Sequence, residues 1–313
     1  MAPYDDTLPL QPPIHLPPDG ELAAAVPGAP EGGDPAQVLR AWALTCRDVL
    51  GGEEGLLLEL VRRFLARDPA AGEPPAALAR LGLVRDSAPY ELTPLGLWTG
   101  RELIAEVTGQ RVPVMGSLAG GDAAALLHGL RSYPEPERDE ELTGWLAGRD
   151  RAAAAAEIAA AVGGASPLGR AVGIELLATR FGEDGRRALD GLLAEPRTGA
   201  VVAARLGRDH RGADGDGTGG GDGRPGSGEL AWALVDMAAA LLEFGGEADE
   251  VVESVALGLD PEEQAGTVAL LALADHPGAE AVLRVFIDHH PDARVSASAR
   301  KALRRLRGLA ARG

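Results

Sequence analysis

The densest group of metal-ligating side chains in this sequence lies near the C-terminus, where Asp288, His289, His290 and Asp292 fall within about one helical turn. Adjacent residues of a helix point about 100° apart, so neighbouring histidines do not share one ion easily, whereas residues four apart lie on one face. A histidine in the last turn of a helix, followed by proline and an N-cap aspartate, explains the same residues structurally. We therefore predict no metal site here.

A stretch rich in glycine and aspartate, at about residues 207–228, offers a second cation candidate. Four of its residues match the first half of a calcium-binding EF-hand loop: Asp214, Asp216, Thr218 and Gly219. The second half departs from the pattern, because Gly221 stands where an apolar residue belongs and Pro225 replaces the bidentate glutamate. We expect a disordered surface loop between two helices, without bound calcium.

Cys46 is the single cysteine, so the chain has no internal disulfide. It lies in a helical pattern with Trp42 and Leu50, where a free cysteine usually behaves as a small buried apolar residue. A nucleophile needs a positioned base, and no sequence signature supplies one. No glycine pair follows a strand in a phosphate-binding pattern. The sequence therefore predicts no catalytic residue and no cofactor.

Composition indicates a folded, mainly α-helical protein. Apolar residues make up 45% of the chain and aromatic residues only 4%, so the core must rely on small and unbranched side chains. Alanine and leucine dominate, and they are the strongest helix formers. β-branched residues are too sparse for a large sheet. A length of 313 residues allows two domains of ordinary size.

The charge of the chain limits its partners. The formal net charge is -17, and a surface of this kind repels polyanions. Binding to nucleic acid or anionic lipid would need a segregated basic patch. No N-terminal signal peptide is visible, and no apolar run approaches the ~20 residues that span a bilayer. We expect a cytoplasmic protein with no membrane segment.

The first 116 residues predict an arm followed by a small domain. Residues 1–34 are rich in Pro and Gly and indicate a disordered arm with polyproline II tendency. The next segments predict three helices, a β-hairpin and a closing helix, at about 35–52, 53–66, 74–82, 83–93 and 94–107. This is the element order of a winged helix.

The string Leu81-Gly82-Leu83-Val84 … Tyr90-Glu91-Leu92-Thr93-Pro94-Leu95-Gly96 resembles the wing region of MarR-like and PadR-like regulators. The resemblance implies a winged-helix-like domain over 35–116. In those families DNA is contacted by the recognition helix and by basic wing residues, and the matching positions here are Arg80 and Arg85. Pro and Ala at 74–77 replace the polar residues that would reach base edges. We expect a structural or protein-binding domain, with DNA binding as the alternative.

Residues 117–313 show helix after helix, which predicts an α-solenoid-like array of HEAT-like hairpins around the loop at 207–228. The string His276-Pro277-Gly278-Ala279 recurs fourteen residues later as His290-Pro291-Asp292-Ala293, and each copy opens an apolar helix. The last helix is similar to the inner helix of a HEAT repeat, a unit that buries its apolar face only by stacking. The whole chain resembles a group of actinobacterial proteins with a winged-helix-like segment and C-terminal HEAT-like repeats, which implies no reaction or ligand.

The last helix is amphipathic, with an apolar face and a basic one. The basic face holds five residues: Arg300, Lys301, Arg304, Arg305 and Arg307. It is a candidate partner-binding face, the alternative being a capping helix whose outer face must be polar.

These observations predict a non-enzymatic interaction or scaffold protein that presents an acidic helical-repeat surface to a protein partner. The alternative is a winged-helix transcriptional regulator that binds DNA. An enzyme would need a deep apolar pocket lined by ionisable groups.

Overall fold

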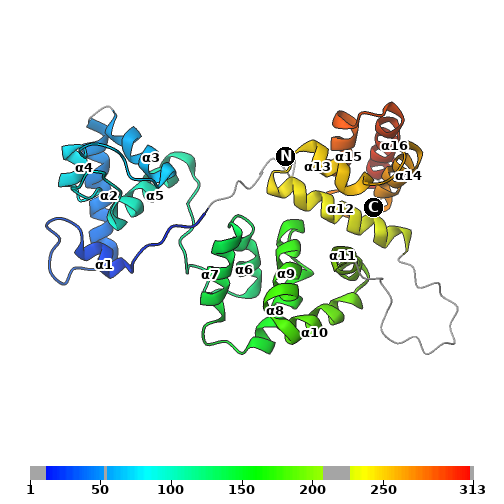
Figure 1. The fold of residues 1–313 in the computed structure, drawn as a ribbon, viewed down its shortest axis with the longest axis horizontal. Coiled ribbons are helices and arrows are strands. Elements are labelled where there is room, and N and C mark those ends of the chain that lie inside the picture. The colour runs from blue at the N-terminus through cyan, green and yellow to red at the C-terminus, as the bar shows by residue number, and fades with distance from the viewer. Residues whose placement is uncertain (1–11, 53–54, 207–225, 311–313) are drawn as a thin grey trace. The chain divides into compact units, whose positions relative to one another are not determined.

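The computed structural model describes residues 12–52, 55–206 and 226–310, and this part of the chain is mainly helical (Figure 1). Within these ranges no strand forms, and extended pairing is limited to isolated β-bridges. The helical class predicted from the abundance of alanine and leucine is confirmed. The chain divides into two compact units, residues 11–117 and residues 118–313.

The described helices of the first unit are α1 (Asp19–Ala24), α2 (Pro35–Gly52), α3 (Leu56–Ala66), α4 (Ala76–Arg80) and α5 (Pro94–Thr108). On α2, Leu39, Trp42, Cys46 and Leu50 recur at helical spacing and are all buried. They form one core cluster with apolar residues of the other helices, including Leu22, Leu60, Leu78 and Leu95. The bounds of α2 match the prediction, because Pro35 favours a first helical position.

Residues 12–34 are ordered, which corrects the prediction of a disordered arm for this part of 1–34; residues 1–11 lie outside the described part. Ile14, 2% exposed, forms a parallel bridge with Val114, with N–H···O distances of 2.9 Å from Ile14 N to Pro113 O and from Met115 N to Ile14 O. Leu22 on α1 is also buried. A few apolar side chains seated in the core outweigh the Pro and Gly composition, since each buried one contributes about 1.5–3 kcal/mol.

The predicted hairpin is reduced to an antiparallel bridge between Val84 and Leu92. Thr93, the N-cap of α5, connects the residue before the hairpin to the first turn of α5. Its hydroxyl donates to Gly82 O at 2.6 Å and accepts from Gly96 N at 3.0 Å. A Cβ at Gly96 would stand 2.0 Å from the carbonyl oxygen of Leu83, so only glycine lets α5 cross the hairpin this closely.

The described helices of the second unit begin with α6 (Ala123–Leu130), α7 (Glu135–Leu146), α8 (Arg151–Val162), α9 (Pro167–Arg180), α10 (Gly182–Leu193) and α11 (Pro196–Leu206). After residue 225 follow α12 (Ser227–Phe244), α13 (Ala248–Ala256), α14 (Pro261–Leu270), a 3-10 turn at Leu271–Leu273, α15 (Ala279–His289) and α16 (Ala293–Ala310). The predicted loop at about 207–228 lies outside the described residues except at its end, where α12 already begins at Ser227.

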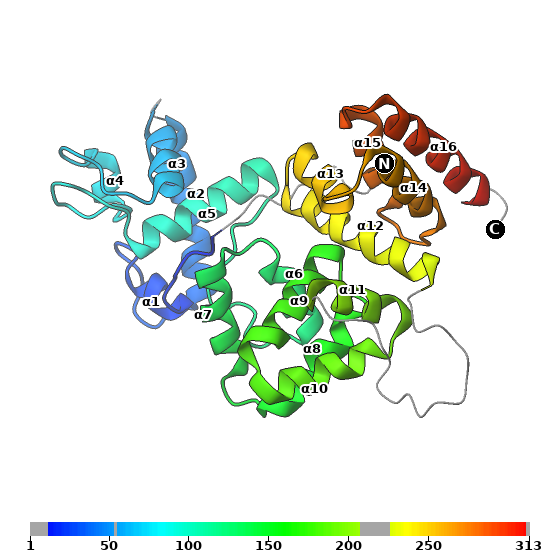
Figure 2. The same cartoon turned by 45° about the vertical axis from the view of Figure 1, so that its right-hand side comes forward.

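Two core clusters fill this unit, and α12 contributes to both. Trp232 and Ala233 pack with α6–α11, whereas Val235 and Ala238 pack with α13–α16. Aspartates cap several helix starts, and at α14 the N-cap Asp260 accepts the backbone N–H groups of residues 262 and 263 at 2.9 Å. In both views α15 lies between α13 and α16, with α14 beside α16 (Figures 1 and 2).

Candidate functional site

Helix α12 carries two buried carboxylates in an otherwise apolar face. Asp236 is fully buried and Glu243 is 8% exposed. They lie seven residues apart, which is about two helical turns, so both project from one side of α12. Buried carboxylates require partners, and these come from helices α6 and α9 and from the α14–α15 connection.

Asp236 lies at the centre of a buried ionic cluster. Its Oδ1 accepts from Nε of Arg170 at 3.0 Å and lies 3.3 Å from Nε2 of His276. Arg170 also donates to the carbonyl oxygens of Val162 and residue 163 at 2.8 and 3.1 Å, which satisfies the C-terminus of α8. The guanidinium lies 4.9 Å from the ring centroid of Trp232, within cation–π range. Among the described residues, Oδ2 of Asp236 has no hydrogen-bond partner.

Glu243 caps the N-terminus of α9 from another helix. Its Oε2 accepts from the backbone N–H of Leu168 at 2.9 Å, and its Oε1 accepts from the Ser166 hydroxyl at 2.8 Å and from Arg131. The negative charge is favourable there because the helix dipole is positive at its N-terminus. The end of α12 is thereby attached to α6 and to α9.

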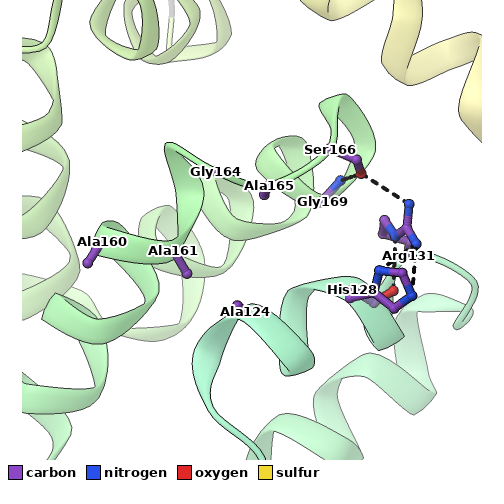
Figure 3. Close-up of a pocket in the computed structure, with 9 residues that line it drawn as sticks. All are labelled: Ala124, His128, Arg131, Ala160, Ala161, Gly164, Ala165, Ser166 and Gly169. Atoms are coloured by element: carbon purple, nitrogen blue, oxygen red, sulfur yellow. Dashed lines mark hydrogen bonds between the residues drawn. The ribbon is translucent and has the colours of Figure 1, made fainter.

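A pocket of about 390 Å³ opens beside this contact, between α6, α8 and α9. Figure 3 shows Ser166, Arg131 and His128 at one end of it and Ala124, Ala160 and Ala161 at the other. Burial and the neighbouring charge of Arg131 lower the pKa of His128, which favours the neutral imidazole. Arg131 donates to Ser166 at 3.2 Å and to Glu243, so its charge is already neutralised by this chain.

The two His-Pro strings share one structural role. The Nδ1 of His276 accepts from Gly278 N at 2.9 Å, and the Nδ1 of His290 accepts from Asp292 N at 3.1 Å. Each Nε2 faces an acceptor on an earlier helix, Asp236 in one case and Gln264 in the other, at 3.3 and 3.0 Å. An imidazole that accepts at Nδ1 carries its proton on Nε2. Each ring therefore fixes the start of the next helix and attaches it to a preceding one.

A groove of about 720 Å³ lies between α13, the α13–α14 turn and the α15–α16 turn. One face of α13 supplies Asp249, Val252, Glu253 and Ala256, which follow i, i+3, i+4 and i+7 spacing. Leu257 extends this row and is 80% exposed. The opposite wall is formed by the end of α15 and the turn after it, at residues 289–292. The groove thus has apolar side chains on its floor and carboxylates on its rim.

The groove is strongly acidic. Asp249, Glu253 and Asp292 line it, and its lining contains neither Lys nor Arg. Among the described residues, no basic side chain lies within ion-pairing distance of Asp249 or Glu253. Their charges are free to attract an incoming cation, in a range where salt screening is incomplete.

The predicted basic face lies on α16, opposite the buried residues Val295, Ala299, Ala302 and Leu303. Arg300, Lys301, Arg304, Arg305 and Arg307 are all exposed. Arg307 is bound to Glu280 at 2.8 Å, and this pair lowers the pKa of the Glu280 carboxyl. For the other four cations, the described part of the chain offers no carboxylate within ion-pairing distance.

The two candidate DNA-binding residues are both exposed but differ in their partners. Arg85 on the hairpin pairs with Glu91 at 2.8 Å, so its charge is neutralised locally. Arg80 ends the short helix α4, and no ion pair to it is found among the described residues. The first unit is acidic as a whole, with 14 Asp and Glu against nine Arg between residues 11 and 117.

The remaining candidates from the sequence are placed as follows. Cys46 is fully buried, and burial raises the pKa of its thiol to about 11. Within the described ranges no group of three or more His, Cys, Asp and Glu side chains is arranged to hold a metal ion. The EF-hand-like residues 214–219 lie outside those ranges. None of the described helices has the length and apolar character to cross a bilayer.

Sequence reasoning missed the groove and the carboxylates of α12. The sequence did contain a sign of the groove. The 39 residues from 245 to 283 contain neither Lys nor Arg, and the segment that became α13 lies within them. The carboxylates of α12 had a weaker sign, because Glu229, Asp236 and Glu243 recur every seven residues in a helix that is otherwise almost wholly apolar. Comparisons with protein-family models, with curated proteins and with solved structures found no match.

Proposed function

We propose that this chain is a non-enzymatic interaction protein whose groove, formed by α13 and the α13–α14 and α15–α16 turns, binds a basic amphipathic segment of a partner protein. The observation that carries the proposal is the position of Leu257. This side chain is 80% exposed and follows Asp249 and Glu253 of α13, two carboxylates without an ion-pair partner in the described part of the chain. The apolar side chain offers contact area and the carboxylates beside it offer charge, so together they suit a partner that carries both apolar and basic groups.

The chemistry of the groove selects the partner. Apolar anchors at i, i+3 and i+4 of an incoming helix would cover Leu257, Val252 and Ala256, as in helix-in-groove recognition. Arginine suits the rim, because its alkyl stem packs on apolar surface while the guanidinium reaches a carboxylate. An acidic segment would be repelled by Asp249, Glu253 and Asp292, the three carboxylates that line the groove.

The same proposal includes a finer description of the fold. We propose that α14, α15 and α16 form HEAT-like hairpins of a short α-solenoid, a class of fold that uses its exposed helix faces and turns for binding. The packing of α16 against both α14 and α15 supports this, as does the shared role of the two His-Pro strings.

A fluorescence anisotropy titration tests the groove. The probe is a labelled amphipathic helical peptide of Leu, Ala and Arg, and its charge-inverted counterpart with Glu in place of Arg is the control ligand. We expect the full chain to bind the basic peptide only. Glu253→Lys and Leu257→Ser should each weaken binding at least about tenfold, equivalent to ~1.4 kcal/mol.

Glu195→Lys is the matched control variant, because Glu195 is an exposed acid in the same unit that does not line the groove. It should leave the affinity within about twofold, a difference of ~0.4 kcal/mol. Equal binding of the two peptides, or equal affinity of all variants, would contradict the proposal.

DNA binding by residues 35–116 is the second candidate function. It is favoured by Arg80, which is exposed and forms no ion pair with any residue that the structure describes. We propose a winged-helix arrangement for this region, supported by the order α2, α3, α4, bridged hairpin, α5. The Arg85–Glu91 pair and the acidic balance of the unit weaken this candidate relative to the first.

A gel-shift assay of the full chain with duplex DNA at low salt separates the two candidates. We expect no shift for the wild-type chain at protein concentrations up to ~10⁻⁵ M, where non-specific DNA-binding proteins already bind. Salt-sensitive binding that is weakened by Arg80→Ala would favour a DNA-binding regulator instead. In Glu91→Gln, Arg85 loses its ion-pair partner. Any contribution of the hairpin at 83–93 to DNA binding should therefore increase in this variant.

A further inference from the structure

The cations of α16 are unusual for a chain with a net charge of -17. Four of them, Arg300, Lys301, Arg304 and Arg305, are exposed and lack an ion-pair partner among the described residues. No acidic residue follows Asp292 in the sequence, so α16 is basic along its whole length. The same unit holds the acidic groove, which lacks cations. One unit therefore presents two complementary surfaces, each without a described partner in its own chain.

The two surfaces do not meet within one copy. The apolar face of α16 is buried against α14 and α15, which directs the four cations away from the rest of the unit. The groove is lined by α13 and by turns, and α15 separates α13 from α16 (Figure 2). Among the described residues of one copy, neither surface is therefore placed to neutralise the other.

The charged rows also match in spacing. Asp249 and Glu253 are four residues apart on α13, and Leu257 continues their row. Arg300 and Arg304 are four residues apart on α16. Residues four apart on a helix are separated by about 6 Å along its axis, so two such helices laid side by side bring two opposite charges into contact at once. The arginine stems would then cover Leu257.

We propose that α16 of one copy of this chain docks in the acidic groove of a second copy. The proposal rests on the preference for a basic partner assigned to the groove above, and it names the occupant. The arginine stems of α16 take the place of apolar anchors, because the apolar face of this helix is buried in its own copy. Because the two surfaces differ, the contact is heterologous, and each copy retains one free groove and one free α16. Such contacts close into a ring or extend into a filament. At physiological salt the overall repulsion between two acidic copies is screened beyond ~8 Å. The ion pairs that form at shorter range then determine whether the copies associate.

Sedimentation velocity of the full chain at a series of concentrations tests the proposal. At ~0.15 M salt we expect concentration-dependent association, and at ~1 M salt, where the screening length falls to about 3 Å, we expect monomers. Arg300→Glu with Arg304→Glu should abolish association, and so should Asp249→Lys with Glu253→Lys. All four positions are exposed, and far-ultraviolet circular dichroism verifies that each variant is folded.

The decisive variant combines both reversals in one chain, because the swapped charges are again complementary. We expect it to associate like the wild-type protein. A wild-type chain that stays monomeric at both salt concentrations overturns the proposal, as does association that survives either single-surface reversal. These outcomes leave the peptide titration unaffected, since that experiment measures the groove of a dilute protein with a foreign ligand.

Discussion

Replacement of Asp236 by alanine is expected to lower the free energy of unfolding by about 3–5 kcal/mol. Arg170 is 4% exposed and depends on Asp236 as its counter-ion, with a nitrogen–oxygen distance of 3.0 Å. Removal of one partner of a buried pair leaves the other charge in a poorly solvating interior, and the Nε2 proton of His276 loses its acceptor as well. The effect is large because it combines a stranded charge with a lost hydrogen bond.

Urea denaturation followed by circular dichroism measures this loss, and hydrogen exchange of α9 and α12 locates it. Asp184→Ala is the matched control, since Asp184 pairs with Arg187 at 3.2 Å on the surface, where such pairs contribute ~0–1 kcal/mol. The double variant Asp236→Leu with Arg170→Met should recover most of the loss, because it removes both charges. Equal effects of Asp236→Ala and Asp184→Ala would show that the buried cluster is not a stability determinant.

The substitution Gly185→Ala should cost about 3 kcal/mol or more, at the upper end of what overpacking causes. A Cβ on Gly185 would stand 2.0 Å from the carbonyl oxygen of Leu177 and 2.8 Å from the Cβ of Phe181. Phe181 is 2% exposed and held in the core, so neither neighbour can move without displacing α9 from α10.

Gly191→Ala on the same helix is the ideal comparison, because a Cβ there meets nothing within 4 Å. Alanine at this exposed position should stabilise the helix by up to ~1 kcal/mol. Thermal or urea unfolding of the two variants should therefore give effects of opposite sign. A shift of the same sign and size for both would mean that the close approach of α9 and α10 is relieved at little cost.

These two glycines also illustrate what the sequence could and could not provide. Both lie in one predicted helical segment, and the amino-acid sequence around them does not distinguish them. The steric contact of Gly185 with Leu177 depends on how two helices pack. Local signals were more informative. The start of α2 at Pro35 follows from chemistry within a few residues, and a helix over 35–52 was predicted.

The buried polar contacts of Asp236 could not be predicted from the sequence either. Asp236 is 66 residues from Arg170 and 40 residues from His276 in the sequence, so no pattern connects them. The repeat of His-Pro was visible and predicted two helix starts, yet the roles of the ring nitrogens depend on acceptors contributed by other helices. Ile14 was missed for a similar reason, since its partner Val114 is a hundred residues away.

The basic face of α16 was predicted residue by residue from its spacing, but its meaning depends on the carboxylates that lie near it. Arg307 is neutralised by Glu280, whereas the other four cations have no ion pair to any described residue, a difference that only the fold determines. The groove likewise follows from the turn that leaves Leu257 80% exposed at the end of α13.

Helix α12 belongs to two cores at once, and this has a consequence for how the second unit loses its structure. Trp232 packs on one side and Val235 on the other, while Asp236 and Glu243 hold α6, α9 and the start of α15 to the same helix. A fluctuation that detaches α12 must open both cores together, so neither can melt alone at low free-energy cost. We therefore expect hydrogen exchange to show that the helices before and after residue 225 open together.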